Sequence, residues 1–136
     1  MVNLIVVTHG EFGAYLVEAA EEIVGVQKCG VRCVSISSRL SVAEVRERLA
    51  RAMEELRTEE GLIIAVDMPG GTPCNIAMSL AKDEPMTRVI CGVNLYMIVT
   101  AFSRRERVGL DELCEAVIAA GKKAILEMKS LLLARA

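Results

Sequence analysis

Short apolar runs alternate with longer amphipathic segments along the chain, and this alternation restricts the possible folds more than any other feature. The runs are rich in β-branched residues and have the length of strands that are buried on both faces. They comprise residues 2–7, 31–36, 62–66 and 88–91. Strands that alternate with helices predict an α/β fold, in which helices cover both faces of an open, mainly parallel sheet.

The segments between the runs carry helical spacing or helix-start signals. We expect helices over residues 14–24, 42–56, 94–102 and 110–122, and a further helix from Thr72 to about Ala81. Right-handed crossovers then favour the doubly wound strand order 2-1-3-4. The segment of residues 124–128 fits either a continuation of the last helix or a fifth strand.

Length and charge narrow the class of protein. The chain has 136 residues, enough for one domain with a sizeable core, so we assign residues 1–136 to a single domain. A net charge of −2 without a basic stripe argues against a nucleic-acid partner. We interpret the basic run at Arg104, Arg105 and Arg107 as a solvated turn. No apolar run is long enough to span a membrane, and the first residues lack the basic region of a signal peptide.

Cysteine usage indicates the compartment. The five cysteines are odd in number and irregularly spaced, which is typical of small buried hydrophobes in a reducing cytoplasm. Only one histidine is available to join the thiols, so we expect no metal site. We also expect no bound cofactor.

Two polar side chains stand at the ends of strands that the predicted order makes neighbours. His9 follows the first strand, and Asp67 ends the third. The loop after Asp67 contains Gly70, Gly71 and Thr72, and Thr72 fits the N-cap of the next helix, with Pro73 at the first helical position. Ligands of such sheets bind beyond the carboxyl ends of the strands, where the order reverses. The sequence therefore predicts that the imidazole, the carboxylate and the glycine loop lie together.

This group of residues supports one kind of chemistry well. A carboxylate that accepts a hydrogen bond from one ring nitrogen fixes the tautomer and leaves the other nitrogen free as a base or nucleophile. Loop amides at a helix N-terminus, together with the Thr72 hydroxyl, favour an anionic group beside that nitrogen. The combination predicts a phosphohistidine site at His9 that works without a metal. The alternative is that His9 only satisfies a loop carbonyl.

Three motifs, in order, resemble a known family. They are Val7-Thr8-His9-Gly10, the stretch from Asp67 to Asn75 (Asp-Met-Pro-Gly-Gly-Thr-Pro-Cys-Asn), and Gly92-Val93-Asn94-Leu95. Together they resemble the EIIA component of the mannose/fructose/sorbose class of the bacterial sugar phosphotransferase system, over essentially the whole chain. Two positions depart from the family's pattern: Pro69 replaces a large apolar residue, and Tyr96 replaces a proline.

The resemblance implies a role for each candidate residue. His9 would be phosphorylated, Asp67 would orient its ring, and Thr72 would hold the phosphate together with amides around Gly10, Gly70 and Gly71. Apolar residues that would rim the site and contact partners, or else pack in the core, are Phe12, Met68, Tyr96 and Met97.

The resemblance also implies partners. HPr would donate the phosphoryl group, and an EIIB component would accept it and pass it to a sugar that enters through membrane subunits. Because the sequence shows no Ala/Pro-rich linker, EIIB would be a separate polypeptide. Family members are homodimers that exchange a C-terminal strand, so residues 124–128 would form an antiparallel fifth strand.

Three other functions remain open on the sequence. A regulatory phosphocarrier of the same fold, without a transport role, would have identical chemistry at His9. A flavin- or nucleotide-binding domain is disfavoured because no G-x-G-x-x-G follows the first strand. The phosphotransferase subunit that serves dihydroxyacetone kinase resembles the same family, but the Gly70-Gly71-Thr72-Pro73 loop favours the sugar branch.

Overall fold

Four parallel strands form one sheet in the order β2-β1-β3-β4, which confirms the predicted topology. The computed structural model describes residues 1–135. The strands are β1 (Asn3–His9), β2 (Val31–Ile36), β3 (Leu62–Val66) and β4 (Thr87–Cys91). The helices are α1 (Phe12–Val24), α2 (Val42–Leu56), α3 (Thr72–Ala81), α4 (Leu95–Arg104), α5 (Leu110–Lys123) and α6 (Met128–Ala134).

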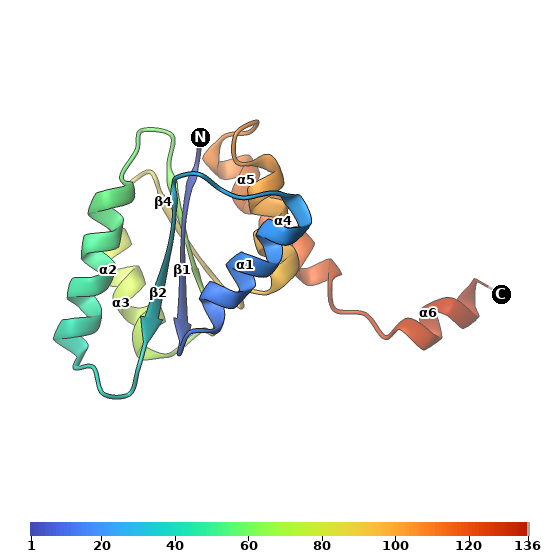
Figure 1. The fold of residues 1–136 in the computed structure, drawn as a ribbon, viewed down its shortest axis with the longest axis horizontal. Helices are drawn as coiled ribbons and strands as arrows, with labels where there is room; N and C mark the ends of the chain where they lie inside the picture. The colour runs from blue at the N-terminus through green and yellow to red at the C-terminus, as the bar shows by residue number, and fades with distance from the viewer. Residues whose placement is uncertain (136) are drawn as a thin grey trace.

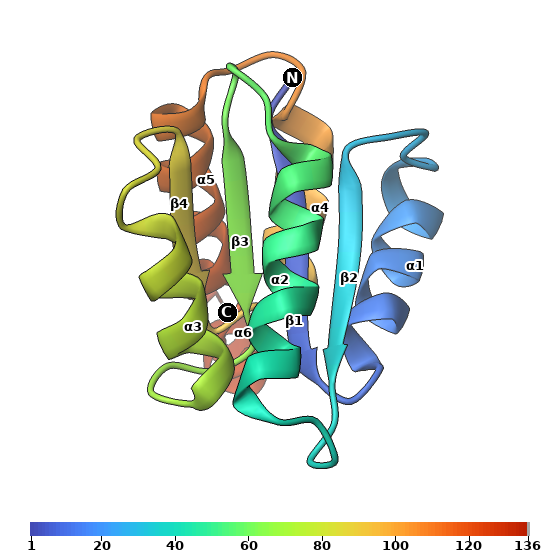
Figure 2. The same cartoon turned by 90° about the vertical axis from the view of Figure 1, so that its left-hand side faces the viewer.

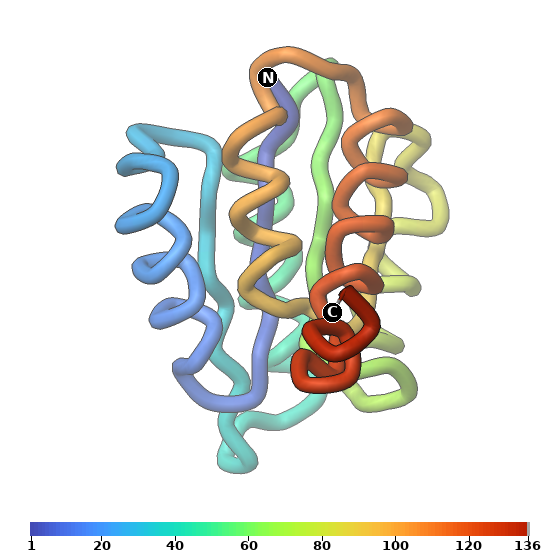
Figure 3. The backbone as a smooth tube through the Cα atoms, turned by 90° about the vertical axis from the view of Figure 1, so that its right-hand side faces the viewer, coloured from blue at the N-terminus to red at the C-terminus, as the bar shows by residue number. Residues whose placement is uncertain are grey.

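The sheet is the middle of three layers. Helices α2 and α3 cover one face, whereas α1, α4 and α5 cover the other (Figure 1). Figure 3 shows these last three helices side by side over the sheet. The described part of the chain contains no helix that is both long and apolar enough to cross a membrane.

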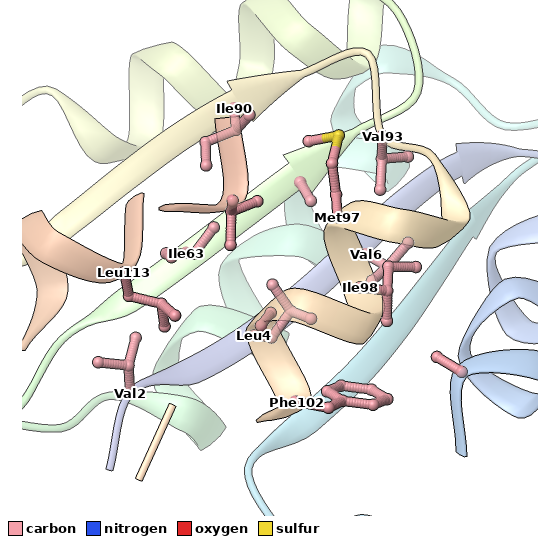
Figure 4. Close-up of a cluster of buried hydrophobic side chains, with 14 of the residues drawn as sticks. Val2, Leu4, Val6, Ile63, Ile90, Val93, Met97, Ile98, Phe102 and Leu113 are labelled. Carbon is pink, nitrogen blue, oxygen red and sulfur yellow. The ribbon is translucent and has the colours of Figure 1, made fainter. Parts of the chain in front are cut away.

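The two central strands explain why the core has two halves. Side chains alternate between the faces of a strand, so Leu4 and Val6 of β1 join the cluster under α1, α4 and α5, while Ile5 and Val7 join the cluster under α2 and α3. Figure 4 shows the first cluster, in which Leu4 and Val6 lie near Ile98 of α4. Each such fully buried aliphatic side chain contributes roughly 1.5–3 kcal/mol. The strands that carry the site are therefore firmly held.

Helix ends follow the sequence signals in most places. Ser41 and Glu44 form the expected capping box at the start of α2, and Asn94 caps α4 by accepting a hydrogen bond from the Met97 N–H at 3.1 Å. Gly25 ends α1 with a φ of 109°, a conformation that favours glycine.

The last segment differs from the expected fifth strand. Residues 124–127 are irregular in the single chain, and α6 then leads away from the sheet (Figure 1). The sequence of α6 is rich in leucine with alanine and lysine, which favour helix, and no residue of α6 is buried. A strand gains its hydrogen bonds only beside another strand, and residues 124–127 pair with no strand of this sheet. The single chain therefore has no fifth strand among its described residues, and a strand exchanged with a second copy of the chain stays a prediction.

Arg105 also differs from its expected place in a solvated turn, because it is 1% exposed. Its guanidinium donates a hydrogen bond to the Cys29 carbonyl at 2.7 Å and another to Gln27 Oε1 at 3.4 Å. Its own carbonyl accepts the Val2 N–H at 3.1 Å. Burial lowers the pKa of Arg105, although Cys29 and Glu106 oppose that effect. The side chain joins three segments at the amino ends of the strands.

Candidate functional site

The carboxyl ends of all four strands lie at one edge of the sheet, as the arrowheads in Figure 2 show. His9 is the last residue of β1, and Asp67 directly follows β3. The pairing of β1 with β3 continues past the end of β3, because the Asp67 N–H donates to the Val7 carbonyl at 3.1 Å. The backbone therefore fixes Asp67 next to His9, as the strand order predicts.

The two side chains are in direct contact. Nδ1 of His9 lies 2.8 Å from one carboxylate oxygen of Asp67, and the His9 backbone N–H donates to the same oxygen at 2.8 Å. The other oxygen accepts the Met68 N–H at 2.9 Å. A carboxylate can only accept, so the hydrogen bond assigns the ring proton to Nδ1. Nε2 of His9 is left with a free lone pair.

Exposure distinguishes the two partners. The His9 side chain is 51% exposed, whereas that of Asp67 is 10% exposed. Burial opposes ionisation of Asp67, but hydrogen bonds from the His9 backbone and ring and from the Met68 N–H, together with the nearby imidazole charge, outweigh it and lower the pKa of this carboxyl group. Asp67 is therefore held as a carboxylate behind a ring that faces solvent.

The glycine loop lies beside the imidazole. A Cβ atom added at Gly71 would lie 3.8 Å from Cε1 of His9. Gly70 has a φ of 81°, which favours glycine. Within residues 1–135, the N–H groups of Gly70, Gly71 and Thr72 donate to no other part of the chain. Free amides at a helix N-terminus form an anion-binding environment.

Two details of the site correct the sequence analysis. Gly71 is the N-cap of α3, so Thr72 is its first residue and its hydroxyl makes no capping hydrogen bond. A glycine can also occupy an N-cap, and the extended conformation of Gly71 fits that position. Gly10 is the second difference: its N–H already donates to the Ile36 carbonyl at 2.8 Å, so it is not available to a phosphate.

The apolar residues predicted around the site fall into two groups. Phe12 at the start of α1, Met68 beside Asp67, and Tyr96 in the first turn of α4 are 44%, 53% and 51% exposed. Met97 is 4% exposed and packs in the core. Only the first three are therefore available for contact with another molecule.

Sequence reasoning missed the role of Thr8. This residue is 1% exposed, and its hydroxyl donates to the Gly10 carbonyl and accepts the Gly13 N–H, both at 3.0 Å. A Cβ atom at Gly13 would lie 2.8 Å from this hydroxyl oxygen. Thr8 thus holds the turn that follows His9. The sequence signal was Thr8 directly before His9, with Gly10 and Gly13 shortly after it.

No group of three or more His, Cys, Asp or Glu side chains within residues 1–135 is arranged to hold a metal ion. The chemistry that the described residues offer is that of a nucleophilic imidazole nitrogen with a carboxylate behind it and unpaired amides beside it.

Comparison with known proteins assigns the family. Residues 3–118 match the model of the EIIA-man family, described as the PTS system fructose IIA component. The chain belongs to this EIIA family. Its resemblance to the mannose/fructose/sorbose class, inferred from three motifs, is confirmed.

Individual relatives are consistent with that assignment. The sorbose-specific EIIA component of Klebsiella pneumoniae is 29% identical over 115 residues, which are 85% of this chain and 83% of that protein. The mannose-specific EIIAB component of Escherichia coli (strain K12) is 27% identical over 130 residues. That alignment covers 95% of this chain but only 40% of the relative, so this EIIA chain spans well under half of that protein.

Solved structures of EIIA proteins share the fold. The mannose/sorbose-specific IIA subunit from Enterococcus faecalis superimposes with a TM-score of 0.83 at 28% identity, covering 92% of each chain.

Proposed function

We propose that this EIIA chain is a cytoplasmic phosphohistidine carrier of a sugar phosphotransferase system. It takes a phosphoryl group from HPr onto Nε2 of His9 and passes it to an EIIB component, which serves sugar phosphorylation during uptake. The observation that carries the proposal is the 2.8 Å contact between Nδ1 of His9 and Asp67, which leaves Nε2 as the free and exposed nitrogen. Family membership supports the same chemistry.

In the first step, the Nε2 lone pair attacks the phosphorus atom that the donor carries. A bond from Nε2 to phosphorus forms while the bond from phosphorus to the donor breaks, and its electron pair remains on the donor. The phosphorylated ring keeps its proton on Nδ1 and becomes cationic. Asp67, 2.8 Å from Nδ1, stabilises that cation because its lowered pKa keeps it ionised.

The phosphoryl oxygens need a separate set of partners. The free N–H groups of Gly70, Gly71 and Thr72 and the exposed Thr72 hydroxyl supply them at the N-terminus of α3. Asp67 does not repel the phosphoryl group strongly because the imidazole lies between the two anions. In the second step the same groups release the phosphoryl group to EIIB by the reverse displacement.

Exposure of the site fits transfer between proteins. The ring is half exposed, and exposed Phe12, Met68 and Tyr96 offer apolar contact area at the same edge of the sheet. We propose that these residues contact HPr and EIIB in turn. Closure by the partner would exclude water during transfer and protect the labile phosphoramidate.

A homodimer is part of the proposal. The C-terminal segment exposes Ile125, Leu126, Met128, Leu132 and Leu133, between 57% and 81% each. An apolar groove of about 690 Å³ between α1, α4 and residues 123–126 lies next to it. Apolar area of this kind is normally covered, and a second copy of the chain would cover it. Light scattering should give twice the chain mass, and Leu132→Glu combined with Leu133→Glu should give monomers; a monomeric wild-type protein would contradict this part.

The carrier function is tested by reconstitution. The protein is incubated with phosphoenolpyruvate, Enzyme I and HPr, and bound phosphate is measured after acid and after base treatment. We expect one acid-labile, base-stable phosphate per chain, and none on His9→Ala. Unlabelled wild-type protein, or equal labelling of His9→Ala, would contradict the proposal.

A further inference from the structure

Two cysteines of the chain are in contact through their sulfur atoms. Sγ of Cys74 lies 3.1 Å from Sγ of Cys91, although the residues are 17 positions apart in sequence. All five cysteines are free thiols, and among residues 1–135 this is the one hydrogen-bond contact between two cysteine sulfurs. Cys74 is 3% exposed, whereas Cys91 is half-buried and reachable from solvent.

The pair connects two elements that border the site. Cys74 lies in the first turn of α3, two residues after Thr72, and Cys91 is the last residue of β4. Of the free amides beside His9, that of Thr72 lies in the first turn of α3, and those of Gly70 and Gly71 directly precede it. A change in the distance between α3 and β4 would therefore displace the amides of the anion-binding loop.

We propose that Cys74 and Cys91 form an intramolecular disulfide, with a small disulfide such as glutathione disulfide as the oxidant, and that this bond slows phosphoryl transfer at His9. The proposal rests on the carrier function for its effect on rate, but the bond itself is independent of that function. It assigns a covalent modification to two residues that are otherwise packed at the edge of the core beneath α2 and α3.

The chemistry takes two exchange steps. The more accessible Cys91 loses its proton and attacks one sulfur of glutathione disulfide, which forms a mixed disulfide and releases one glutathione thiolate. Cys74 then loses its proton and attacks the Cys91 sulfur, which forms the protein disulfide and releases the second glutathione thiolate. The two protein thiols lose two electrons and two protons in total, and one glutathione disulfide becomes two glutathione molecules.

The contact distance explains why the bond would matter for the site. A disulfide requires a sulfur–sulfur distance of about 2.05 Å, so the two sulfurs must approach by roughly 1 Å from their contact distance. Because β4 is held in the sheet, we expect the first turn of α3 to move. A displacement of about 1 Å in a group that positions a reacting atom can lower a rate by about 10²-fold.

Burial governs how fast the bond forms. Burial, the hydrogen bond with Cys74 and nearby Asp67 together raise the pKa of Cys91 to about 11. Few Cys91 thiols are ionised near neutral pH, so oxidation should be slow there and should accelerate about tenfold per pH unit between pH 7 and pH 9. We therefore expect the disulfide to form during prolonged exposure to the oxidant and not during a brief one.

The experiment compares reduced and oxidised protein. The full chain is treated with excess glutathione disulfide at pH 8.5 and desalted, and its disulfides are mapped by mass spectrometry after alkylation. The initial rate of phosphate uptake from HPr is then measured before and after dithiothreitol. We expect a Cys74–Cys91 bond, a 10- to 100-fold lower rate, and full recovery on reduction.

Matched variants separate this bond from other thiol chemistry. Cys114→Ala should respond to the oxidant like wild type, whereas Cys91→Ala and the near-isosteric Cys91→Ser should keep their reduced rate after the same treatment. Absence of a Cys74–Cys91 bond, or a complete bond with an unchanged rate, would overturn the inference. Reduced wild-type protein that takes up no phosphate would instead contradict the carrier function.

Discussion

His9 at the carboxyl end of the sheet and Arg105 at its amino end are both basic side chains, but their surroundings are opposite. At the carboxyl end, His9 is half exposed, has a carboxylate partner and keeps one ring nitrogen free. At the amino end, Arg105 is 1% exposed and donates to the Cys29 carbonyl, and no carboxylate of residues 1–135 lies within hydrogen-bond distance of it. The carboxyl end exposes an imidazole, whereas the guanidinium at the amino end is buried and donates hydrogen bonds to the loop at residues 27–29.

This difference in burial predicts that His9 matters for the transfer rate and Arg105 for the stability of the fold. A side chain that holds loops together contributes by filling space and satisfying carbonyls, so its loss should be felt in the free energy of unfolding. A side chain that reacts must stay accessible and only partly satisfied, so its loss should be felt in rate. Each prediction below tests one side of this comparison.

The largest expected effect is on transfer rate at the carboxyl end. In the proposed mechanism, Asp67→Asn removes the negative charge that stabilises the phosphorylated ring and offers a donor where Nδ1–H needs an acceptor. We expect the rate of phosphate uptake from HPr to fall about 10²-fold at a temperature where the variant remains folded. The exposed Asp83→Asn is the matched control and should keep the wild-type rate. A wild-type rate for Asp67→Asn would show that the carboxylate does not act on His9.

The second prediction concerns stability at the amino end. Arg105→Ala leaves a cavity and removes the donor to the Cys29 carbonyl, so we expect a loss of about 2–3 kcal/mol in the free energy of unfolding in urea. The exposed Arg107→Ala should change it by less than about 0.5 kcal/mol. Below its unfolding transition, Arg105→Ala should accept phosphate at the wild-type rate. If Arg105→Ala kept the wild-type stability but accepted phosphate more slowly, Arg105 would act on the rate and not on stability, which contradicts this comparison.

A smaller effect is expected from pH. The pKa of Asp67 is lower in the folded protein than in the unfolded chain. Its contribution to stability is therefore present above the usual aspartate range and is lost as pH falls from that range through the lower folded pKa. Urea midpoints measured from pH 7 down to pH 3 should fall less steeply for Asp67→Asn than for wild type. Parallel curves would mean that the hydrogen bonds to Asp67 are not coupled to folding.

Chain topology made the central site predictable. His9 and Asp67 end two strands that right-handed crossovers place side by side, and the register of β1 with β3 leaves little freedom in how they meet. The N-cap of α3 was misplaced by one residue because both Gly71 and Thr72 are acceptable N-caps. Sequence patterns limit helix ends only to within a residue or two.

Features that depend on other segments could not be predicted. Arg105 lies in a run of charged residues that looks solvated, and only the convergence of the N-terminus and the loop at Cys29 buries it. The sequence could not decide between helix and strand for residues 124–128. In the single chain, residues 124–127 form neither. Tyr96 and Met97 are neighbours, yet only the helix orientation decides that Met97 is buried and Tyr96 exposed.

The most direct test of the account asks which nitrogen of His9 carries the phosphate. The protein is labelled with ¹⁵N-histidine and phosphorylated through HPr, and its single imidazole is observed by ¹⁵N and ³¹P NMR. Because Nδ1 is bound to Asp67, we predict phosphate on Nε2 with the proton retained on Nδ1. Phosphate on Nδ1, or on any residue other than His9, would contradict the account.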